Sequence, residues 1–521
     1  MSLMREMSRW WPIVTIGLIV GFPVACARVS ERSGGEPPLA LRIAVESDVH
    51  GFDPHLENEV GTLSVLDNIF EPLVRPDQQM RVQPCLATNW ETPNELTWRA
   101  HLREGVRFHD GVEMTSEDVK YSYDRILQSP ETTYRALASS MVGIDVIDRY
   151  TIDLKLRDPY NVVVDLGGVP ILPSAYIRNH GLAGFSEHPI GTGPYMLSGW
   201  DRGREIRLTA FADYWRRLAA YEQVVFSVIP RSEYRLRAIE HGIVDIAYRI
   251  PSKPAPDNGY RLHVQPSPTV YYLAFDVSHD RSPYVDTPTN PFRDPGVRRA
   301  FQLAVNVENL VDRVLAGRAV RASQLVAPGV FGYNPAITPP EPDRGTARGL
   351  LRRAGFPNGF TATLDIIDSR AAVGEFLKSE LETIGVRLSL NLISRDAFYK
   401  KIYADHDSSL YLVGWSCSSG DANSLFQYGL HTLDVSRRLG LQNVTGYSNS
   451  RLDQMIEVTS RIAEPVERLE MLQQTMDLAM SDLPWLPLWV GQSVYGIRSS
   501  VLYTPRLDDH IDAFDARPRG D

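Results

Sequence analysis

The strongest constraint on this chain is an apolar run at residues 10–25, which follows Arg5 and Arg9. The run is shorter than the ~20 residues that a helix needs to span a bilayer, and it ends in small residues. A basic flank, a short apolar segment and a small-residue end are typical of a secretory signal. Residues 1–25 are therefore expected to be a signal peptide. No second long apolar run follows, so the rest of the chain is expected to fold in water outside the cytoplasm.

Cys26 directly follows residues 23–25 (PVA). This string resembles the lipobox of bacterial lipoproteins, with Pro23 at the position where leucine is usual. The resemblance implies a lipid on Cys26, which would anchor the mature chain to the membrane. Ordinary cleavage nearby and an uncleaved anchor are the open alternatives. Residues 26–40 are rich in Ser, Gly, Pro and charged residues, which favours a flexible tether.

Composition narrows the function classes. A chain of 521 residues suggests roughly three compact units at about 150 residues each. A formal net charge of -10 argues against nucleic-acid binding, which needs a concentrated positive face. The three cysteines, at 26, 85 and 417, have no C-x-x-C spacing and indicate neither a zinc ribbon nor a disulfide scaffold. The 12 histidines are scattered, so neither a metal site nor a cofactor is expected.

Hydrophobic periodicity predicts a mixed α/β protein. Residues 41–45 and 96–102 have strand patterns, and Thr115 begins a capping-box string that opens a helix. Further along, helices are predicted around residues 297–305, from Asp343 to a stop at Gly355, and over residues 376–384 with a stop at Gly385; residues 386–393 then alternate as a strand. Helix followed by strand, repeated, indicates a partly parallel sheet.

Short strings rich in Gly, Pro and aromatic residues recur from residue 52 to residue 488. They are residues 52–54 (FDP), 68–74 (NIFEPLV), 86–91 (LATNWE), 98 (W), 102–111 (LREGVRFHDG), 118–122 (DVKYS), 191–195 (GTGPY), 242–245 (GIVD), 275–276 (FD), 297–301 (VRRAF), 354–359 (AGFPNG) and 484–488 (PWLPL). In this order and spacing they resemble the solute-binding proteins of peptide- and nickel-type ABC importers, over about residues 41–510. Any one string alone is weak evidence, whereas the ordered series is specific.

The resemblance implies an α/β, two-lobed, hinged periplasmic-binding-protein fold with an extra subdomain in lobe I (cluster C type). Lobe I would comprise residues 41–272, with the subdomain at about 61–186, and residues 490–521 would return to it. Lobe II would span residues 277–489. In such a fold a ligand that touches both lobes stabilises the closed form by its differential affinity.

The implied cleft element is residues 412–421 (LVGWSCSSGD). In peptide-binding relatives the matching strand pairs with the peptide backbone, the residue matching Trp415 lines a side-chain pocket, and an aspartate three residues later holds the ligand's α-ammonium group. Here that third position is Ser418, and Asp421 is the one acid of the loop. A carboxylate compensates a buried ammonium better than a hydroxyl does, so Asp421 is the candidate replacement. The neighbouring candidates are Gly414, Ser416 and Cys417.

On the lobe I side, the resemblance places Asn58, Glu59 and Val60 where the backbone of relatives faces the ligand. Tyr134 lies where relatives have a cleft tyrosine, and Tyr271 and Tyr272 fall at the first hinge crossing. Plainer interpretations stand beside these. Trp415 fits a core, Asp421 fits a helix cap or a loop carboxylate, and residues 109–111 (HDG) fit a structural turn.

The sequence therefore predicts a periplasmic or extracytoplasmic receptor that delivers a peptide or peptide-like solute to an ABC permease. It is expected to be a monomer and not an enzyme. Glycosides, opines and chelated nickel are alternative ligands, and a signalling receptor is an alternative role. A third alternative is an envelope hydrolase using Ser416, but the G-x-S-x-G elbow lacks its last glycine.

Overall fold

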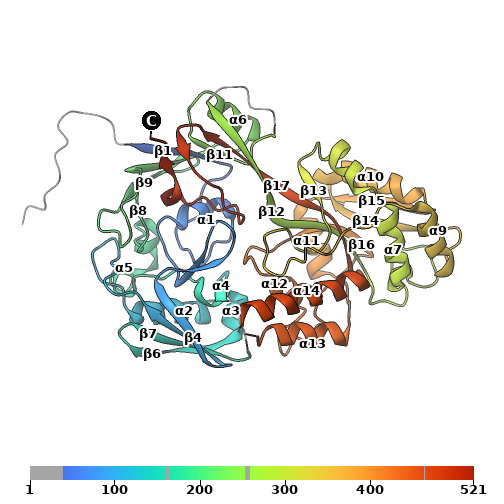
Figure 1. Ribbon diagram of the computed structural model, residues 1–521, viewed down its shortest axis with the longest axis horizontal. Coiled ribbons are helices and arrows are strands. Elements are labelled where there is room, and N and C mark those ends of the chain that lie inside the picture. The colour runs from blue at the N-terminus through green and yellow to red at the C-terminus, as the bar shows by residue number, and fades with distance from the viewer. Residues whose placement is uncertain (1–38, 160–162, 253–258, 463, 521) are drawn as a thin grey trace, which may run out of the picture. The chain divides into compact units, whose positions relative to one another are not determined.

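The computed structural model describes residues 39–159, 163–252, 259–462 and 464–520 (Figure 1). The predicted signal peptide, Cys26 and nearly all of the predicted tether lie outside the described residues. The first strand, β1 (Ala40–Val45), begins one residue before the predicted start of order.

A mixed sheet of eleven strands runs through the described residues. The strand order is β15-β14-β16-β12-β17-β11-β1-β10-β9-β8, and β13 pairs with β17. β1 is parallel to β10 and β11, and β14 is parallel to β15 and β16, which confirms the expected partly parallel sheet. The remaining strands of this sheet are β8 (Tyr195–Asp201), β9 (Glu205–Ala210), β10 (Gln223–Val228), β11 (Ile246–Tyr248), β12 (Tyr260–Phe275), β13 (Ala319–Arg321), β14 (Phe360–Ile367), β15 (Val386–Ile393), β16 (Leu410–Ser416) and β17 (Trp485–Arg498).

Two long strands, β12 and β17, lie antiparallel at the centre of this sheet and extend between its two halves (Figure 1). Their register shifts between Pro266 and Val270. Proline has no N–H to donate, so Pro266 and Pro268 weaken the ladder between the two strands at this point.

Buried apolar side chains form separate cores on the two sides of this irregularity. The first core collects residues between 41 and 248 together with residues 495–516. The second core collects residues 270–490. A third core, of residues 73–171, lies under a small sheet of its own. The C-terminal segment therefore packs with the N-terminal half of the described chain.

The third core contains a four-stranded antiparallel sheet of order β4-β5-β7-β6, covered by α2. The predicted capping box is present: the Thr115 backbone N–H donates to Asp118, and the Thr115 side chain accepts from the backbone of Asp118. The elements are β4 (Ala87–Asn94), β5 (Thr97–Leu102), α2 (Ser116–Gln128), α3 (Arg135–Ser140), β6 (Met141–Asp148) and β7 (Thr151–Leu156).

Three helices around the second core match predicted ones, although α10 begins at Ala371, five residues before its predicted start. Asp343 caps α9 by accepting from the Thr346 N–H, and Gly355 and Gly385 follow α9 and α10 with φ of 91° and 92°, which suits glycine. The helices are α7 (Pro295–Ala304), α8 (Val307–Asn309), α9 (Arg344–Arg353), α10 (Ala371–Glu382), α11 (Arg395–Tyr399), α12 (Asn423–Leu425), α13 (Ser450–Thr459) and α14 (Pro465–Asp482).

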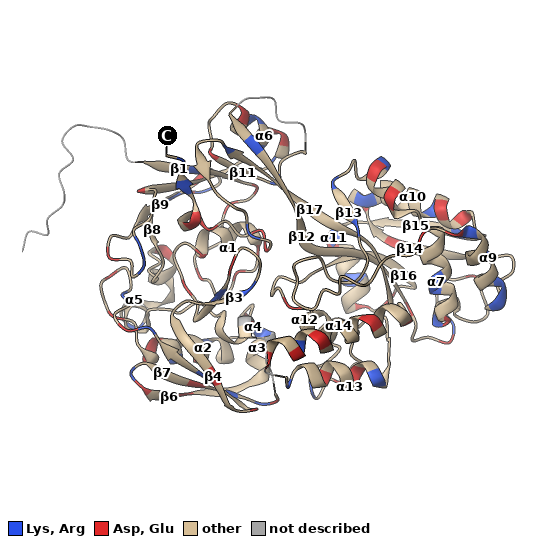
Figure 2. Ribbon diagram, in the orientation of Figure 1, with Lys and Arg blue, Asp and Glu red and all other residues tan. Residues whose placement is uncertain are grey.

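Helix α6 packs against β1, β11 and β17 in a smaller fourth core, and the other remaining elements border the first and third cores. Charged residues of both signs lie mainly on helices and connecting segments (Figure 2). Among the described residues, no helix combines the length and the apolar character needed to cross a membrane. These elements are α1 (Val60–Leu66), β2 (Val74–Pro76), β3 (Val82–Pro84), α4 (Val163–Gly167), α5 (Ser174–Glu187), α6 (Ser232–Glu240), β18 (Val501–Leu502) and β19 (Arg517–Pro518).

Candidate functional site

A pocket of about 380 Å³, here called the cleft pocket, lies where segments from both sides of the β12–β17 irregularity meet. Pro268 and Thr269, at the irregularity itself, line it. Most of its wall comes from the side of the first and third cores. The lining segments are within residues 54–76, 133–170, 268–269, 416–419 and 506–512, together with Arg249.

The end of β16 supplies the second-core side of this pocket. Thr269 on β12 pairs with Ser416, the last residue of β16, and both line the pocket. Ser418 and Ser419 line it as well. The structure thus places the predicted residues Ser416 and Ser418 in the pocket and adds Ser419, which the sequence did not single out. All three present hydroxyl groups and no charge.

Trp415 and Gly414 lie in β16 but outside the cleft-pocket lining. The Trp415 ring packs against Trp485 at a centroid distance of 6.0 Å. Its indole N–H is buried, and no described residue accepts a hydrogen bond from it. At Gly414 a Cβ would lie 2.9 Å from the Tyr271 ring. Both residues therefore serve close packing here, as the plainer interpretation of Trp415 allows.

The Asp421 carboxylate forms a buried ion pair with Arg468. Its carboxylate accepts from the Arg468 guanidinium at 2.6 and 3.1 Å, and from the Asn423 N–H at 2.9 Å. Both side chains are nearly buried, at 10% and 7% exposed. Burying one charge without the other would be costly, so each holds the other in place. The structure thus corrects the idea that Asp421 replaces the missing acid at Ser418: Asp421 does not line the pocket, and its charge is already compensated.

Cys417 and the two tyrosines at the predicted hinge crossing also lie outside this lining. Cys417 is buried, and burial raises the pKa of its thiol to about 12, so the thiol is neutral. Tyr272 is fully buried and stacks on Trp485 at 4.4 Å. Tyr271 stacks on Trp489 at 4.7 Å and accepts a hydrogen bond from Arg370 at 3.2 Å. Tyr272 is therefore a core residue of the second half.

Of the three predicted residues at the start of α1, two line the pocket and one does not. Asn58 and Val60 line the cleft pocket. Glu59 does not line it; its carboxylate accepts from the Ser47 hydroxyl at 2.9 Å. Tyr134, at the start of α3, lines the pocket, and its ring lies 5.8 Å from that of His55. Burial, with the nearby carboxylates of Asp67 and Asp165, raises the pKa of Tyr134 well above its usual value.

Residues 506–512 (RLDDHID) are pocket residues that sequence reasoning missed. Arg506 pairs with Asp508, Asp512 pairs with Arg75, and the His510 ring bonds Asp67 at 2.7 Å. The high density of charged residues in this string could have indicated a functional segment, but no local pattern shows which surface the segment faces. These residues reach the pocket because the C-terminal segment returns to the first core.

The predicted structural turn at residues 109–111 supports the pocket wall from behind. His109 donates from Nε2 to the Gly193 carbonyl at 3.0 Å and accepts at Nδ1 from the Gly191 N–H at 3.2 Å. These glycines pack on the wall segment: a Cβ on Gly191 would lie 2.1 Å from the Ile69 carbonyl oxygen. Thr192 donates to Glu71, which lines the pocket.

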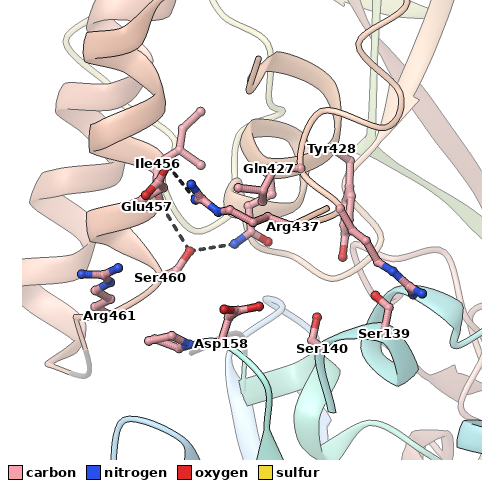
Figure 3. A pocket seen from close by; sticks show the side chains of 13 residues that line it. Ser139, Ser140, Asp158, Gln427, Tyr428, Arg437, Ile456, Glu457, Ser460 and Arg461 are labelled. Atoms are coloured by element: carbon pink, nitrogen blue, oxygen red, sulfur yellow. Dashed lines mark hydrogen bonds and ion pairs between the residues drawn. The ribbon is translucent and has the colours of Figure 1, made fainter. Parts of the chain in front are cut away.

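A second pocket, of about 330 Å³, contains none of the predicted site residues (Figure 3). It lies between residues 139–159 of the third core and residues 427–461 of the second core. Arg437 pairs with Glu457 at 2.7 Å, and Gln427 donates to the Ser460 hydroxyl at 2.7 Å. In the described part of the chain, no group of three or more His, Cys, Asp or Glu side chains is arranged to hold a metal ion.

Residues 81–436 match the model of one protein family, described as bacterial extracellular solute-binding proteins, family 5. The chain belongs to this family. It is therefore a solute-binding receptor of the kind that serves ABC importers, located outside the cytoplasm. Family 5 is a family of binding proteins.

Known family 5 proteins and related structures resemble the chain over nearly its whole length. The glutathione-binding protein GsiB of Escherichia coli O1:K1 is 25% identical over 502 residues, which cover 92% of this chain and 93% of the relative. The structure of DppA from Helicobacter pylori with the peptide STSA has a TM-score of 0.73 at 23% identity, covering 92% of this chain and 98% of that one. NikZ from Campylobacter jejuni with Ni(L-His) has a TM-score of 0.72 at 19% identity, covering 92% and 100%. The predicted two-lobed α/β fold is thereby confirmed, while the three ligands differ from one another.

Proposed function

We propose that this chain captures a small peptide or peptide-like solute in the cleft pocket and delivers it to an ABC permease, without changing the solute chemically. The supporting observation is that the pocket is lined from both sides of the β12–β17 irregularity, by residues 54–76 and 506–512 on one side and 416–419 on the other. A volume of about 380 Å³ is at the small end of the range for ligand pockets and suits a short peptide.

The proposed lobes are residues 41–272 with 490–521, carrying the subdomain at about 61–186, and residues 277–489. The packing of Val270 and Tyr272 in the second core favours a crossing a few residues earlier, at Pro266–Thr269. Few backbone hydrogen bonds join β12 to β17 there, so rotation costs least at this point. A solute that touches Ser416 and Ser418 on one side and Asn58, Val60 or Tyr134 on the other would favour the closed form.

A hydrolase acting through Ser416 is disfavoured by its surroundings. Ser416 ends a strand that is paired with β12, and among the described residues no histidine is hydrogen-bonded to its hydroxyl.

We further propose that the mature chain is a monomer held at the membrane by a lipid on Cys26. Opines, glycosides and chelated nickel are the ligands that the test below separates from peptides.

Native mass spectrometry of the mature chain, secreted and purified without denaturant, tests the proposal. A mass excess that disappears on mild denaturation and fragments as a peptide is the expected result. A trapped glycoside, opine or metal chelate would overturn the peptide part and leave the receptor function. Turnover of the trapped compound, abolished in Ser416→Ala, would overturn the proposal that the chain is not an enzyme.

A further inference from the structure

The walls of the cleft pocket carry an excess of negative charge. Seven carboxylates line it against three arginines and one histidine, His510. Even with His510 protonated, the formal charge of the lining is negative by three units. A pocket that excludes water strengthens the effect of such an excess on any ligand that enters it.

The arginines of this lining are already neutralised. Arg506 pairs with Asp508, and Arg75 pairs with Asp512; within each pair both side chains are less than one fifth exposed. Arg249 pairs with Glu46 at 2.5 Å. A carboxylate group of a ligand would have to displace an internal partner to reach Arg75 or Arg506. Arg249 is 45% exposed, but Glu46, which lies outside the lining, balances its charge, so the excess of carboxylates in the lining remains.

The carboxylates that are not paired with these arginines differ in access. Glu71 is buried and accepts hydrogen bonds from Tyr214, Trp215 and Thr192, and Asp509 is buried and accepts from Ser493 and Tyr495. The side chain of Glu57 is 12% exposed, whereas that of Asp67 is 39% exposed. Asp67 is thus more accessible than Glu57, and the fifth of these carboxylates, Asp165 on α4, is half-buried.

The surroundings of Asp67 favour the binding of a positively charged group. It is the C-cap of α1, where the negative end of the helix dipole favours a cation. Asp67 and Asp165 both line the cleft pocket together with Tyr134, so two carboxylates contribute to the negative potential inside it. The one cationic partner of Asp67 within hydrogen-bond distance is His510, bonded through a single carboxylate oxygen among the described contacts.

The loop after β16 does not offer a competing acid. Ser418 lines the pocket and carries no charge, and the Asp421 charge is compensated by Arg468. We propose that the ligand carries an ammonium or guanidinium group that binds Asp67, on the first-core wall of the cleft pocket. This inference rests on the proposed receptor function and specifies the charge of the ligand and the place where that charge is recognised.

The test uses the mature chain and three probes: a mixture of tripeptides without Lys, Arg or His, the same mixture N-acetylated, and two uncharged disaccharides. Binding is measured by native mass spectrometry and calorimetry. We expect the free-amine peptides to bind the wild type, and Asp67→Asn to weaken them at least about tenfold. The acetylated peptides should bind the wild type as weakly as the free-amine peptides bind Asp67→Asn. Asp145→Asn, which removes the same charge from an exposed position on β6, should have no effect.

A second variant separates ligand recognition from a structural role. His510→Gln removes the cationic partner that competes for Asp67, so the free amines should bind more tightly. Equal loss of affinity in Asp67→Asn and His510→Gln would overturn the proposal, because both would then act through the fold. Binding of acetylated peptides as tight as that of free ones, or of disaccharides alone, would overturn the cation site and leave the receptor function. Binding of no probe would count against both.

Discussion

Acid should destabilise this protein through His109, a buried histidine that must stay neutral. Its two ring nitrogens are both used, Nε2 as a donor to Gly193 and Nδ1 as an acceptor from the Gly191 N–H. Protonation would put a hydrogen on Nδ1 and break the second bond. Burial lowers the pKa of His109 to about 4 from its ordinary value of 6.5, although the bond to Gly193 works in the opposite direction.

The size of the effect follows from this difference in pKa. Between the two values the unfolded chain binds a proton that the folded chain does not, so stability is lost as pH falls through this window. For pKa values of 6.5 and about 4, the loss between pH 8 and pH 5 is about 2 kcal/mol. His109 holds Gly191 and Gly193 in place, and these glycines pack against the backbone of Asn68 and Ile69. The loss of stability at low pH therefore acts on the support of the cleft pocket.

Urea unfolding at pH 8 and pH 5 measures the effect, with His109→Gln as the variant. Glutamine keeps a donor and an acceptor but does not titrate in this range. We expect the wild type to lose about 2 kcal/mol more than His109→Gln on going from pH 8 to pH 5. His188→Gln, at an exposed position, is the matched control and should behave as the wild type. An identical pH dependence in His109→Gln and the wild type would refute the reasoning.

Three further outcomes are expected. Asp421→Asn should lower the free energy of unfolding by about 3–5 kcal/mol because Arg468 is left buried without its partner. The control Asp201→Asn breaks an exposed pair and should cost less than about 1 kcal/mol. Similar values for the two variants would contradict the assignment of Asp421 to the interior. Gly191→Ala should lower the free energy of unfolding by about 3 kcal/mol because its Cβ would lie 2.1 Å from the Ile69 carbonyl oxygen. Gly143→Ala has open space around the new Cβ and should leave the free energy of unfolding nearly unchanged. Cys26→Ser should abolish an acyl mass on the mature chain in intact-mass spectrometry, and a wild-type chain without that mass would rule out the lipid anchor.

The sequence alone determined the family, the partly parallel α/β fold and many helix ends. These features are local or cumulative: Thr115 and Asp343 cap helices through contacts three residues away, and Gly355 and Gly385 end them by adopting positive φ. The ordered series of strings added evidence along the whole chain. Of the residues that the sequence singles out, Asn58, Val60, Tyr134, Ser416 and Ser418 line the cleft pocket, and their role in binding a ligand stays a prediction.

Only the tertiary structure decided which charges are available to a ligand. Asp421 and Arg468 are 47 residues apart, and Asp67 and His510 are 443 residues apart, so no local pattern reveals either contact. The same holds for Trp415, whose neighbour Trp485 comes from another strand. Whether a carboxylate is compensated or accessible depends on its partners in space, because electrostatic and packing energies follow distance and burial and not position along the chain.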